Sequence, residues 1–531
     1  GTSIAYYIFR SFLSAFICAI PPTLTSLWSL GLFGYLQVPI TYLTTVLPTL
    51  ALILAFADGI VLYFRWQSSN ADSPDLDINL LRAIRDVGPA SALTSITTVL
   101  AFLSFSFASG TALKEFSALG MAVVSMAFFA VIIGLPLAIH WAIVLGIVKP
   151  GKVRKPAFQG IGERLFGIVI PRSGAISIAA IVMVLALGIV HFFVTPEFRI
   201  TDYLPKNSET RNAEELTNSV AGGRSPIFVS LPKAKDGPAL TDANLERLRL
   251  VQDLLADIYG RDRVFSLAEI AERLETDQAK ERLSEQIETA LSETRSTFVS
   301  RDGKNMLVTV YIPSDQAIAQ TLEQISQTRD RLAATGWADE AVVTGFDVLM
   351  ADEFTRLVEQ LRTSLLLAIF LGVMIIGIAT RSPVLTAAAI TPNLLPILAV
   401  ELVVWLKGGT VNLSEVIALT ISFGIAIDNA VHVINFYNRE IKAGRTVEDA
   451  VSGAVKEVAP ALAASTAILC ASCLVTQMSI LPVVPVLGRL MIATLLFAYI
   501  ANLLILPANI LSINRLLNRS SGHRAEKRGE S

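Results

Sequence analysis

Ten long apolar segments recur along the chain, and they constrain its fold more than any other feature of the sequence. An α-helix of about 20 apolar residues crosses the hydrocarbon core of a bilayer, which is roughly 30 Å thick. Hydrophobic residues make up 53% of the 531 residues and the mean hydropathy is +0.58. We therefore expect a polytopic α-helical membrane protein. The predicted spans are residues 12–36, 43–64, 88–108, 116–147, 174–195, 362–379, 383–406, 413–436, 459–478 and 483–511.

The chain repeats itself at an offset of about 370 residues, as expected of an internal duplication. At this offset Pro21 aligns with Pro392, and Pro89 aligns with Pro460. Because the register and the order of the predicted spans both hold, the sequence predicts two parallel copies of one helical unit.

The second half contains a polar segment, residues 196–361, that the first half lacks. The offset also places Gly1 opposite the middle of the span 362–379. We therefore expect the natural protein to continue upstream by roughly 200 residues, with one further span and a sister polar domain.

Basic residues concentrate in two segments that flank predicted spans. Short cytoplasmic loops carry an excess of Lys and Arg, whereas long polar domains are free of that bias. We therefore expect both basic segments in the cytoplasm and residues 196–361 on the opposite side. The first segment, 148–173, carries Lys149, Lys152, Arg154, Lys155, Arg164 and Arg172, and the C-terminal tail carries Arg515, Arg519, Arg524, Lys527 and Arg528.

Two amphipathic segments, residues 76–87 and 446–458, occupy matching positions in the two halves. Each has apolar residues at helical period and directly precedes a predicted span. This pattern favours a pair of interfacial helices on the cytoplasmic side.

The polar segment 196–361 alternates strand-like and helix-like patterns, which is typical of an α+β domain. The order of the elements predicts a ferredoxin-like sandwich on the extracytoplasmic side. We expect Asp242 to cap the first helix. The predicted elements are a strand at Ile227–Leu231, a helix from Asp242 to about Ile258, a hairpin of Phe298–Ser300 with Met306–Ile312, a helix near 317–334 and a strand at Ala341–Thr344.

Two carboxylates lie deep in predicted spans, and the repeat aligns Asp58 with Asp428 to within one residue. A carboxylate near the bilayer centre costs about 2.5–3.5 kcal/mol on insertion scales, so acids at this depth commonly serve a function. Hydroxyl or amide side chains would hold helices together at lower cost, which disfavours a purely structural role. We therefore predict that Asp58 and Asp428 form a site for a proton or a cation.

His432 lies four residues after Asp428, so the two side chains share a helix face and could exchange a proton. Asn429 lies about 100° round the same helix and could contact a neighbouring helix. The first half has Leu62 in place of the His, so the two halves are not equivalent. A packing role for His432 stays open beside proton transfer.

Small and hydroxyl-bearing residues accompany the two acids. Gly59 and Gly424 would let neighbouring helices approach closely. The hydroxyl groups could relay protons towards the acids, or they could bond only to the backbone of their own helix. The hydroxyl residues are Thr94, Ser95, Thr97 and Thr98 in the first half, and Ser465 and Thr466 in the second.

The remaining polar residues of the spans indicate no further chemistry. We expect Glu401 to face water or the membrane interface, and we interpret His140 and His191 as incidental. No phosphate-binding loop and no catalytic constellation is present, so the sequence predicts neither an enzyme nor a cofactor, with the proton as coupling ion. The three cysteines are expected to pack in apolar spans rather than to bind a metal; they are Cys18, Cys470 and Cys473.

The duplicated halves, with an Asp in the fourth span of each, resemble the resistance-nodulation-division (RND) superfamily. The stretch from Gly424 to Glu440, which contains Gly-Ile-Ala-Ile-Asp-Asn-Ala-Val-His, is most similar to its MMPL or hydrophobe/amphiphile efflux branch, as is Asp202–Pro205. The resemblance implies a bacterial inner-membrane exporter of lipid-like, hydrophobic or amphiphilic molecules, with proton coupling at Asp58 and Asp428. Unlike some relatives, this chain has no second Asp adjacent to either position.

On the span numbering of that superfamily, the chain would hold the third to the twelfth spans. The assignment is residues 1–147 for the end of the second span and the third to sixth, 148–173 for a cytoplasmic linker, 174–195 for the seventh span, 196–361 for a periplasmic porter-like domain, 362–512 for the eighth to twelfth spans and 513–531 for a basic cytoplasmic tail.

Two other functions compete with a transporter. A lipid or sterol sensor could use the same bundle without net transport, and a translocation motor could act on polypeptides. The paired acids favour transport. The expected partners are a lipid-like substrate, membrane lipids, a second copy of the chain and a periplasmic protein. The net charge of −2 gives no reason to expect nucleic acid.

Overall fold

The computed structural model divides the chain into two compact units. The bundle unit comprises residues 1–196, 357–479 and 483–531, and the sheet unit comprises residues 197–356 and 480–482. Parts of two predicted motifs, Lys149–Lys155 and Asp202–Pro205, lie outside the described residues. The structure describes residues 11–529 except 42, 70–74, 109, 148–160, 197–203, 206, 222, 224, 234–240, 273–281, 283–297, 301–303, 314, 338–339, 409 and 412.

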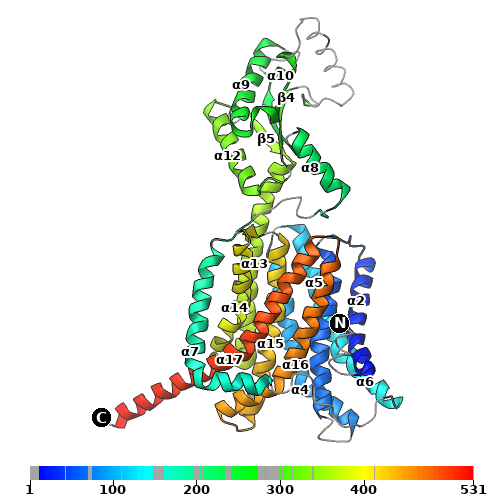
Figure 1. Ribbon diagram of the computed structural model, residues 1–531, viewed down its shortest axis with the longest axis vertical. Coiled ribbons are helices and arrows are strands. Elements are labelled where there is room, and N and C mark those ends of the chain that lie inside the picture. The colour runs from blue at the N-terminus through cyan, green and yellow to red at the C-terminus, as the bar shows by residue number, and fades with distance from the viewer. Residues whose placement is uncertain are drawn as a thin grey trace. The chain divides into compact units, whose positions relative to one another are not determined.

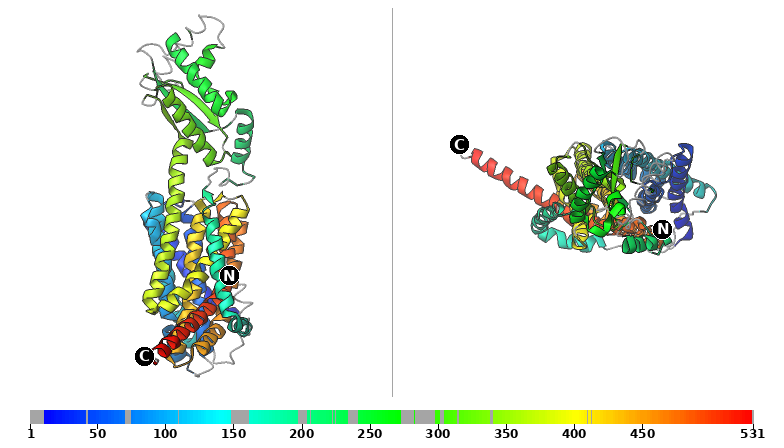
Figure 2. Two further views of the ribbon diagram at one scale, coloured as in Figure 1. Left: turned by 90° about the vertical axis from the view of Figure 1, so that its left-hand side faces the viewer. Right: turned by 90° about the horizontal axis from the view of Figure 1, so that it is seen from above.

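Within these described ranges, ten helical segments are long and apolar enough to cross a membrane, which confirms a polytopic α-helical membrane protein. They run side by side in the bundle unit, with α2 and α7 at opposite edges (Figures 1 and 2). The helices are α2 (Phe12–Tyr35), α3 (Leu47–Ser69), α4 (Leu76–Ser104), α5 (Thr111–Phe129) with α6 (Leu135–Val144), α7 (Ile161–His191), α13 (Phe346–Thr380), α14 (Pro383–Leu406), α15 (Leu413–Lys442), α16 (Val447–Val475) and α17 (Val483–Gly529).

One of the ten segments is interrupted by a π-helical turn. Helix α5 passes through the turn Ala130–Gly134 into α6, and Pro136 follows at the start of α6. Because proline lacks an N–H group, it cannot complete a regular α-helical ladder, and a π-turn absorbs the irregularity.

Equivalent side chains begin equivalent helices in the two halves. Ser11 caps α2 and Ser382 caps α14, each by accepting a hydrogen bond from a backbone N–H three residues later. Asp75 caps α4 and Thr446 caps α16, again at aligned positions. An N-cap satisfies N–H groups that have no partner within the helix and is typically worth about 1 kcal/mol. The duplication therefore extends to the local chemistry that starts each helix.

Several helices continue beyond the predicted boundaries. The amphipathic segments 76–87 and 446–458 are the first turns of α4 and α16, not separate interfacial helices, because no residue between each segment and its span ends the helix. Helix α7 begins at Ile161 and runs through Pro171, so the predicted linker 148–173 is partly helical. Helix α17 continues through the predicted tail 513–531 as far as Gly529.

Helix α15 is the central helix of the bundle. Its apolar window is 100% buried by the surrounding helices, whereas that of the peripheral helix α7 is 17% buried. The two halves also pack against each other, because α4 of the first half contacts α15 of the second, and α16 of the second half contacts α3 of the first. The helices that carry Asp58 and Asp428 thus lie where the halves meet.

The sheet unit is an antiparallel four-stranded sheet with the order β3-β4-β2-β5, and α9 and α12 pack against each other beside it. This order matches a ferredoxin-like βαββαβ arrangement and confirms the predicted α+β class. Its elements are α8 (Glu209–Ala221), β2 (Ser225–Pro232), α9 (Asp242–Tyr259), β3 (Val264–Phe265), α10 (Leu267–Glu272), β4 (Asn305–Ile312), α12 (Ile318–Ala334) and β5 (Val342–Gly345). A short parallel pair, β1 (Thr195–Pro196) with β6 (Thr410–Val411), belongs to the bundle unit.

One local prediction for the sheet unit is confirmed only in part, and another is wrong. The predicted hairpin of Phe298–Ser300 with Met306–Ile312 is present as a single antiparallel bridge between Val299 and Met306, whereas the strand paired with β4 in the sheet is Val264–Phe265. A strand of two residues shows no alternating pattern, so the sequence gives no sign of it. The side chain that caps α9 is Thr241, one residue before the predicted Asp242.

The core of the sheet unit lies between the sheet and its helices. Val229 of β2 faces Val308 of β4 in the strand register, and both are fully buried. Leu255 of α9 is also 0% exposed, whereas Leu250 on the same helix is 49% exposed. The two leucines therefore allow a comparison within one helix, because Leu255 lies in the core and Leu250 lies at the surface.

We predict that Leu255→Ala lowers the free energy of unfolding of the sheet unit by about 2–5 kcal/mol, because it removes apolar burial and leaves a cavity. Leu250→Ala should change the stability by less than about 0.5 kcal/mol. Hydrogen exchange of the β4 amides in the whole protein measures both effects. Equal protection of β4 in the two variants would contradict the assigned core.

Candidate functional site

Asp58, Asp428 and His432 converge in the middle of the bundle. His432 extends from α15 towards α3, and its Nε2 lies 3.9 Å from Oδ1 of Asp58. This distance is longer than a hydrogen bond but within the range of an ion pair when both groups are charged. The side chains of His432 and Asp58 are 4% and 14% exposed. The structure therefore brings the histidine of one half to the carboxylate of the other half.

Asp428 is buried beside this contact. Its Oδ1 makes no hydrogen bond to any group that the structure describes. A buried polar atom without a partner typically costs about 1–3 kcal/mol. Stability alone does not account for such a group, and an exchangeable proton or a water molecule would satisfy it. The neighbouring Asn429 is also buried, at 7% exposure.

Further polar atoms accompany Asp428 along α15. The amide of Asn502 on α17 donates to the carbonyl oxygens of Ala426 at 3.4 Å and Ala498 at 3.0 Å. Its Oδ1 and the hydroxyl of Ser422 are buried and have no hydrogen-bond partner among the described groups. No pattern in the sequence indicated Asn502, because the predicted span 483–511 contains no acid.

The two glycines beside the acids have different surroundings. A Cβ atom at Gly424 would lie 3.3 Å from Cγ2 of Thr98 on α4, so the glycine permits a close approach of α4 and α15. A Cβ atom at Gly59 would lie 3.8 Å from its nearest neighbour, Leu135, which is an ordinary contact.

The predicted hydroxyl residues bond mainly within their own helices. Thr94 donates to the carbonyl oxygen of Ser91 and Ser465 donates to that of Leu462, both at 3.0 Å. Thr98 can donate to Thr94 O at 3.0 Å or to Gly424 O of α15 at 3.5 Å. It is therefore the hydroxyl that reaches towards the acid-bearing helix α15. The other three, Ser95, Thr97 and Thr466, are half-buried or buried.

A network of charged residues joins the two halves at the basic end of the bundle, where α3 and α15 end and α4 and α16 begin. Arg65 of α3 donates two hydrogen bonds to Oδ2 of Asp86, at 2.8 and 2.5 Å, and one to Oε1 of Glu457 at 3.1 Å. Arg439 of α15 also contacts Asp86 at 3.1 Å. Asp86 and Glu457 are equivalent in the repeat, so one arginine bridges the same acid of both halves.

The prediction for Glu401 and His191 is wrong. Glu401 is 6% exposed, and its Oε2 lies 2.9 Å from Nδ1 of His191 on α7. Arg362 of α13 donates to the carbonyl oxygen of His191 at 2.9 Å. The buried acid thus has a partner on another helix, which the position of Glu401 near the end of its span did not indicate. His140 likewise contacts Asp77, at 2.9 Å.

No group of His, Cys, Asp and Glu residues in the described part of the chain could hold a metal ion. The three cysteines are free thiols: Cys18 and Cys473 are buried, and Cys470 is half-buried.

Comparisons with known proteins agree with this architecture. A search of curated proteins finds no match. The crystal structure of SecDF in its super-membrane-facing form superposes with a TM-score of 0.61 over 99% of this chain, at 13% sequence identity. The chain spans 61% of the length of SecDF, and the likeness shows the fold alone.

The fold and the duplicated spans define a multi-pass membrane protein of the RND type. Residues 205–529 match the MMPL family, and residues 10–135 match the sterol-sensing domain of SREBP cleavage-activation. The chain belongs to the MMPL family. The first matched region includes Asp428 and the second includes Asp58.

We predict that Gly424→Ala and Gly59→Ala have different effects on stability. Alanine favours a helix over glycine by about 1 kcal/mol at either position. At position 424 the new methyl group presses on Thr98, which its hydrogen bond holds in place, and overpacking costs about 1–3 kcal/mol. In thermal unfolding, Gly59→Ala should therefore have a higher Tm than Gly424→Ala. The reverse order of the two Tm values would show that α4 and α15 are not in close contact at Gly424.

Proposed function

We propose that the protein is a proton-driven secondary transporter that exports hydrophobic or amphiphilic, lipid-like molecules across a bacterial inner membrane. The observation that carries this proposal is the contact of His432 with Asp58 across the two halves, beside the buried Asp428. Membership of the MMPL family and the RND-type fold support the transporter class.

The proposed coupling step is a change of protonation at this contact. A protonated His432 and an ionised Asp58 attract each other, whereas the loss of either charge removes the attraction. Because the two groups lie on α15 and α3, protonation sets how strongly the two halves hold each other. Asp428 would take up or release the proton one helical turn from His432.

The energy available suits a switch of this kind. One proton that crosses the membrane potential supplies about 2.3 kcal/mol per 100 mV. Two conformations of a protein commonly differ by a few kcal/mol, so one or two protons suffice to change their populations. The network of Arg65, Asp86 and Glu457 would hold the basic end of the bundle together while the acids titrate.

The substrate class and the partners rest on the family. The MMPL assignment supports a lipid-like or amphiphilic substrate, and it supports a bacterial inner membrane in which the basic end would face the cytoplasm. We further propose that the sheet unit is periplasmic, where it would meet substrate or a periplasmic partner, and that copies of the chain could associate.

A lipid or sterol sensor is the second candidate. It is favoured by the match of residues 10–135, which include Asp58, to a sterol-sensing domain. A sensor would use the same acids to respond to a ligand without net movement of protons or lipid. The two candidates therefore differ in flux across the membrane.

We predict that Asp428→Asn and Asp58→Asn each reduce proton flux and the export of a fluorescent lipid by about 100-fold or more. An amide cannot take up and release a proton as a carboxylate does, and the loss of a proton-transfer group typically has an effect of this size. The measurement uses full-length protein in proteoliposomes under an imposed pH gradient. Thermal unfolding of each variant establishes that it is folded.

Glu401→Gln is the matched control, because it removes a buried carboxylate elsewhere in the same bundle. It should retain flux, since Glu401 pairs with His191 and not with the central acids. If the wild type binds a photoactivatable sterol but moves neither protons nor lipid, the sensor replaces the transporter. If all three variants transport like the wild type, the acids are structural.

A further inference from the structure

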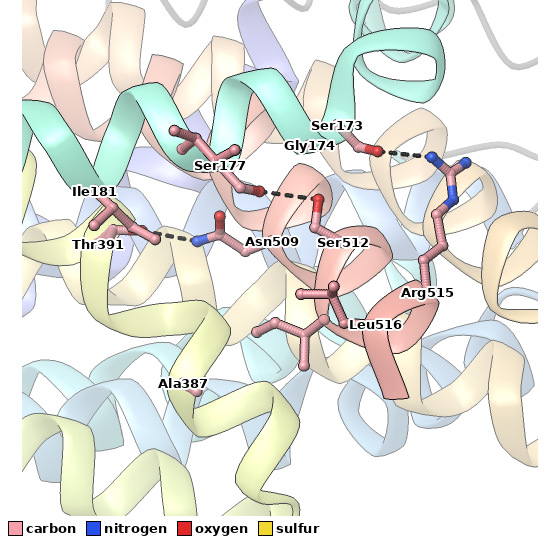
Figure 3. A pocket seen from close by; sticks show the side chains of 12 residues that line it. Ser173, Gly174, Ser177, Ile181, Ala387, Thr391, Asn509, Ser512, Arg515 and Leu516 are labelled. Carbon is pink, nitrogen blue, oxygen red and sulfur yellow. Dashed lines mark hydrogen bonds between the residues drawn. The ribbon is translucent and has the colours of Figure 1, made fainter. Parts of the chain in front are cut away.

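A cavity of about 420 Å³ lies between α7, α14 and α17 near the basic end of the bundle (Figure 3). Its volume is within the range of sites that bind small ligands. The cavity lies apart from the central acids, and the proposed transport mechanism does not use it. Farther along the same three helices, Ala180 of α7, Leu395 of α14 and Ile505 of α17 belong to one buried apolar cluster.

One side of the cavity carries a polar ladder of three hydrogen bonds between helices. Its rungs, in order from the basic end inward, are Arg515 Nη1 to Ser173 Oγ at 2.9 Å, Ser177 Oγ to Ser512 Oγ at 3.1 Å and Asn509 Nδ2 to Thr391 Oγ1 at 2.7 Å (Figure 3). The residues on α17 lie three apart, so the ladder descends about 9 Å from Arg515 to Asn509.

The other side of the cavity is apolar and open. Ile178 of α7 and Leu516 of α17 line it, and each is 65% exposed. Both residues lie within spans that the surrounding lipid would cover, because the apolar segments run over Phe166–His191 and Val484–Asn518. The opening therefore faces the lateral surface of the bundle.

A cation is placed at the mouth of the cavity. Arg515 lies three residues before the end of its apolar segment, which is the depth of lipid headgroups. Its guanidinium also pairs with Glu448 of α16 at 2.7 Å, and both side chains are about half exposed, at 47% and 56%. An exposed pair of this kind contributes little to stability, so an anionic ligand can compete with Glu448.

We propose that this cavity binds one anionic phospholipid of the leaflet at the basic end. The phosphate would accept hydrogen bonds from Arg515, the hydroxyl groups of the polar ladder would meet the glycerol esters, and one acyl chain would lie along Ile178. The order of these groups, cation first, then hydroxyls, then apolar side chains, matches the order of groups in a phospholipid. Basic pockets between helices on the cytoplasmic side are known to favour such headgroups.

The charge of the surroundings adds to the attraction. Arg172 is adjacent to Ser173 at the mouth, and the sequence beyond Arg515 continues with Arg519, Arg524, Lys527 and Arg528. Basic residues next to a span attract anionic headgroups, and the attraction falls off within a Debye length. The preference for an anionic lipid should therefore weaken as salt is added.

The test is native mass spectrometry of the full-length protein with phosphatidylglycerol or phosphatidylcholine at equal concentration. The wild type should bind phosphatidylglycerol about tenfold more tightly, because both lipids have a phosphate but only phosphatidylcholine carries a choline cation, which the basic surroundings disfavour. Arg515→Gln should reduce this ratio to about one, and Arg515→Lys should retain most of it. Binding is measured without a pH gradient, so the result does not depend on the proposed transport.

Two variants separate a lipid site from a structural ion pair. Glu448→Gln breaks the same pair but frees Arg515, so it should retain or increase the preference for phosphatidylglycerol. Gly174→Leu should weaken the binding of both lipids. A Cβ atom at position 174 would meet nothing within 4 Å, so the leucine side chain has room to extend into the cavity and fill it.

Four results would overturn the proposal. The first is equal binding of the two lipids by the wild type, and the second is an equal loss in Glu448→Gln and Arg515→Gln. The third is displacement of phosphatidylglycerol by millimolar inorganic phosphate, which would identify a site for a free anion. The fourth is retained binding in Gly174→Leu with an unchanged Tm, which would place the lipid elsewhere on the bundle.

Discussion

The bundle depends on one constraint: polar groups that leave water for an apolar interior must find their partners on other helices. Between lipid-embedded helices the hydrophobic effect contributes little, so packing and hydrogen bonds hold the helices together. Helix α15 is the extreme case, because its apolar window is wholly buried and still contains Asp428, Asn429 and His432. The long contact from His432 to Asp58 and the unpaired oxygen of Asp428 show that this requirement is met only in part at the centre. The pair of Glu401 with His191 meets this requirement.

The amino-acid sequence predicted the architecture because the architecture rests on local and periodic signals. Apolar runs predict the spans, and the repeat predicts two halves whose equivalent helices begin at equivalent caps such as Ser11 and Ser382. The α+β class of the sheet unit also follows from alternation along the chain. Boundaries were less predictable: proline inside a membrane helix need not end it, so α7 runs through Pro171.

The partners of the buried groups could not be predicted, because they are set by packing between helices that are distant in the sequence. The spacing of Asp428 and His432 indicates a shared face, yet the carboxylate that lies 3.9 Å from the histidine belongs to Asp58 on α3, more than 370 residues earlier. The same limit applies to Glu401, whose partner lies on α7, and to Asn502, which approaches α15 from α17. An alignment of the halves by themselves cannot supply these pairs, since the first half has Leu62 where the second has His432.

Arg65 shows that the two halves of the duplication are not interchangeable. It contacts the equivalent acids Asp86 and Glu457 at once, while its own counterpart in the second half is Asn435, which donates only to the backbone carbonyl oxygen of Asp86 at 3.2 Å. Arg439 of α15, whose counterpart in the first half is Ser69, supplies a second arginine to Asp86. Each half therefore contributes one arginine to this acid, but from different positions along its helix, and two copies of either half would not reproduce the network.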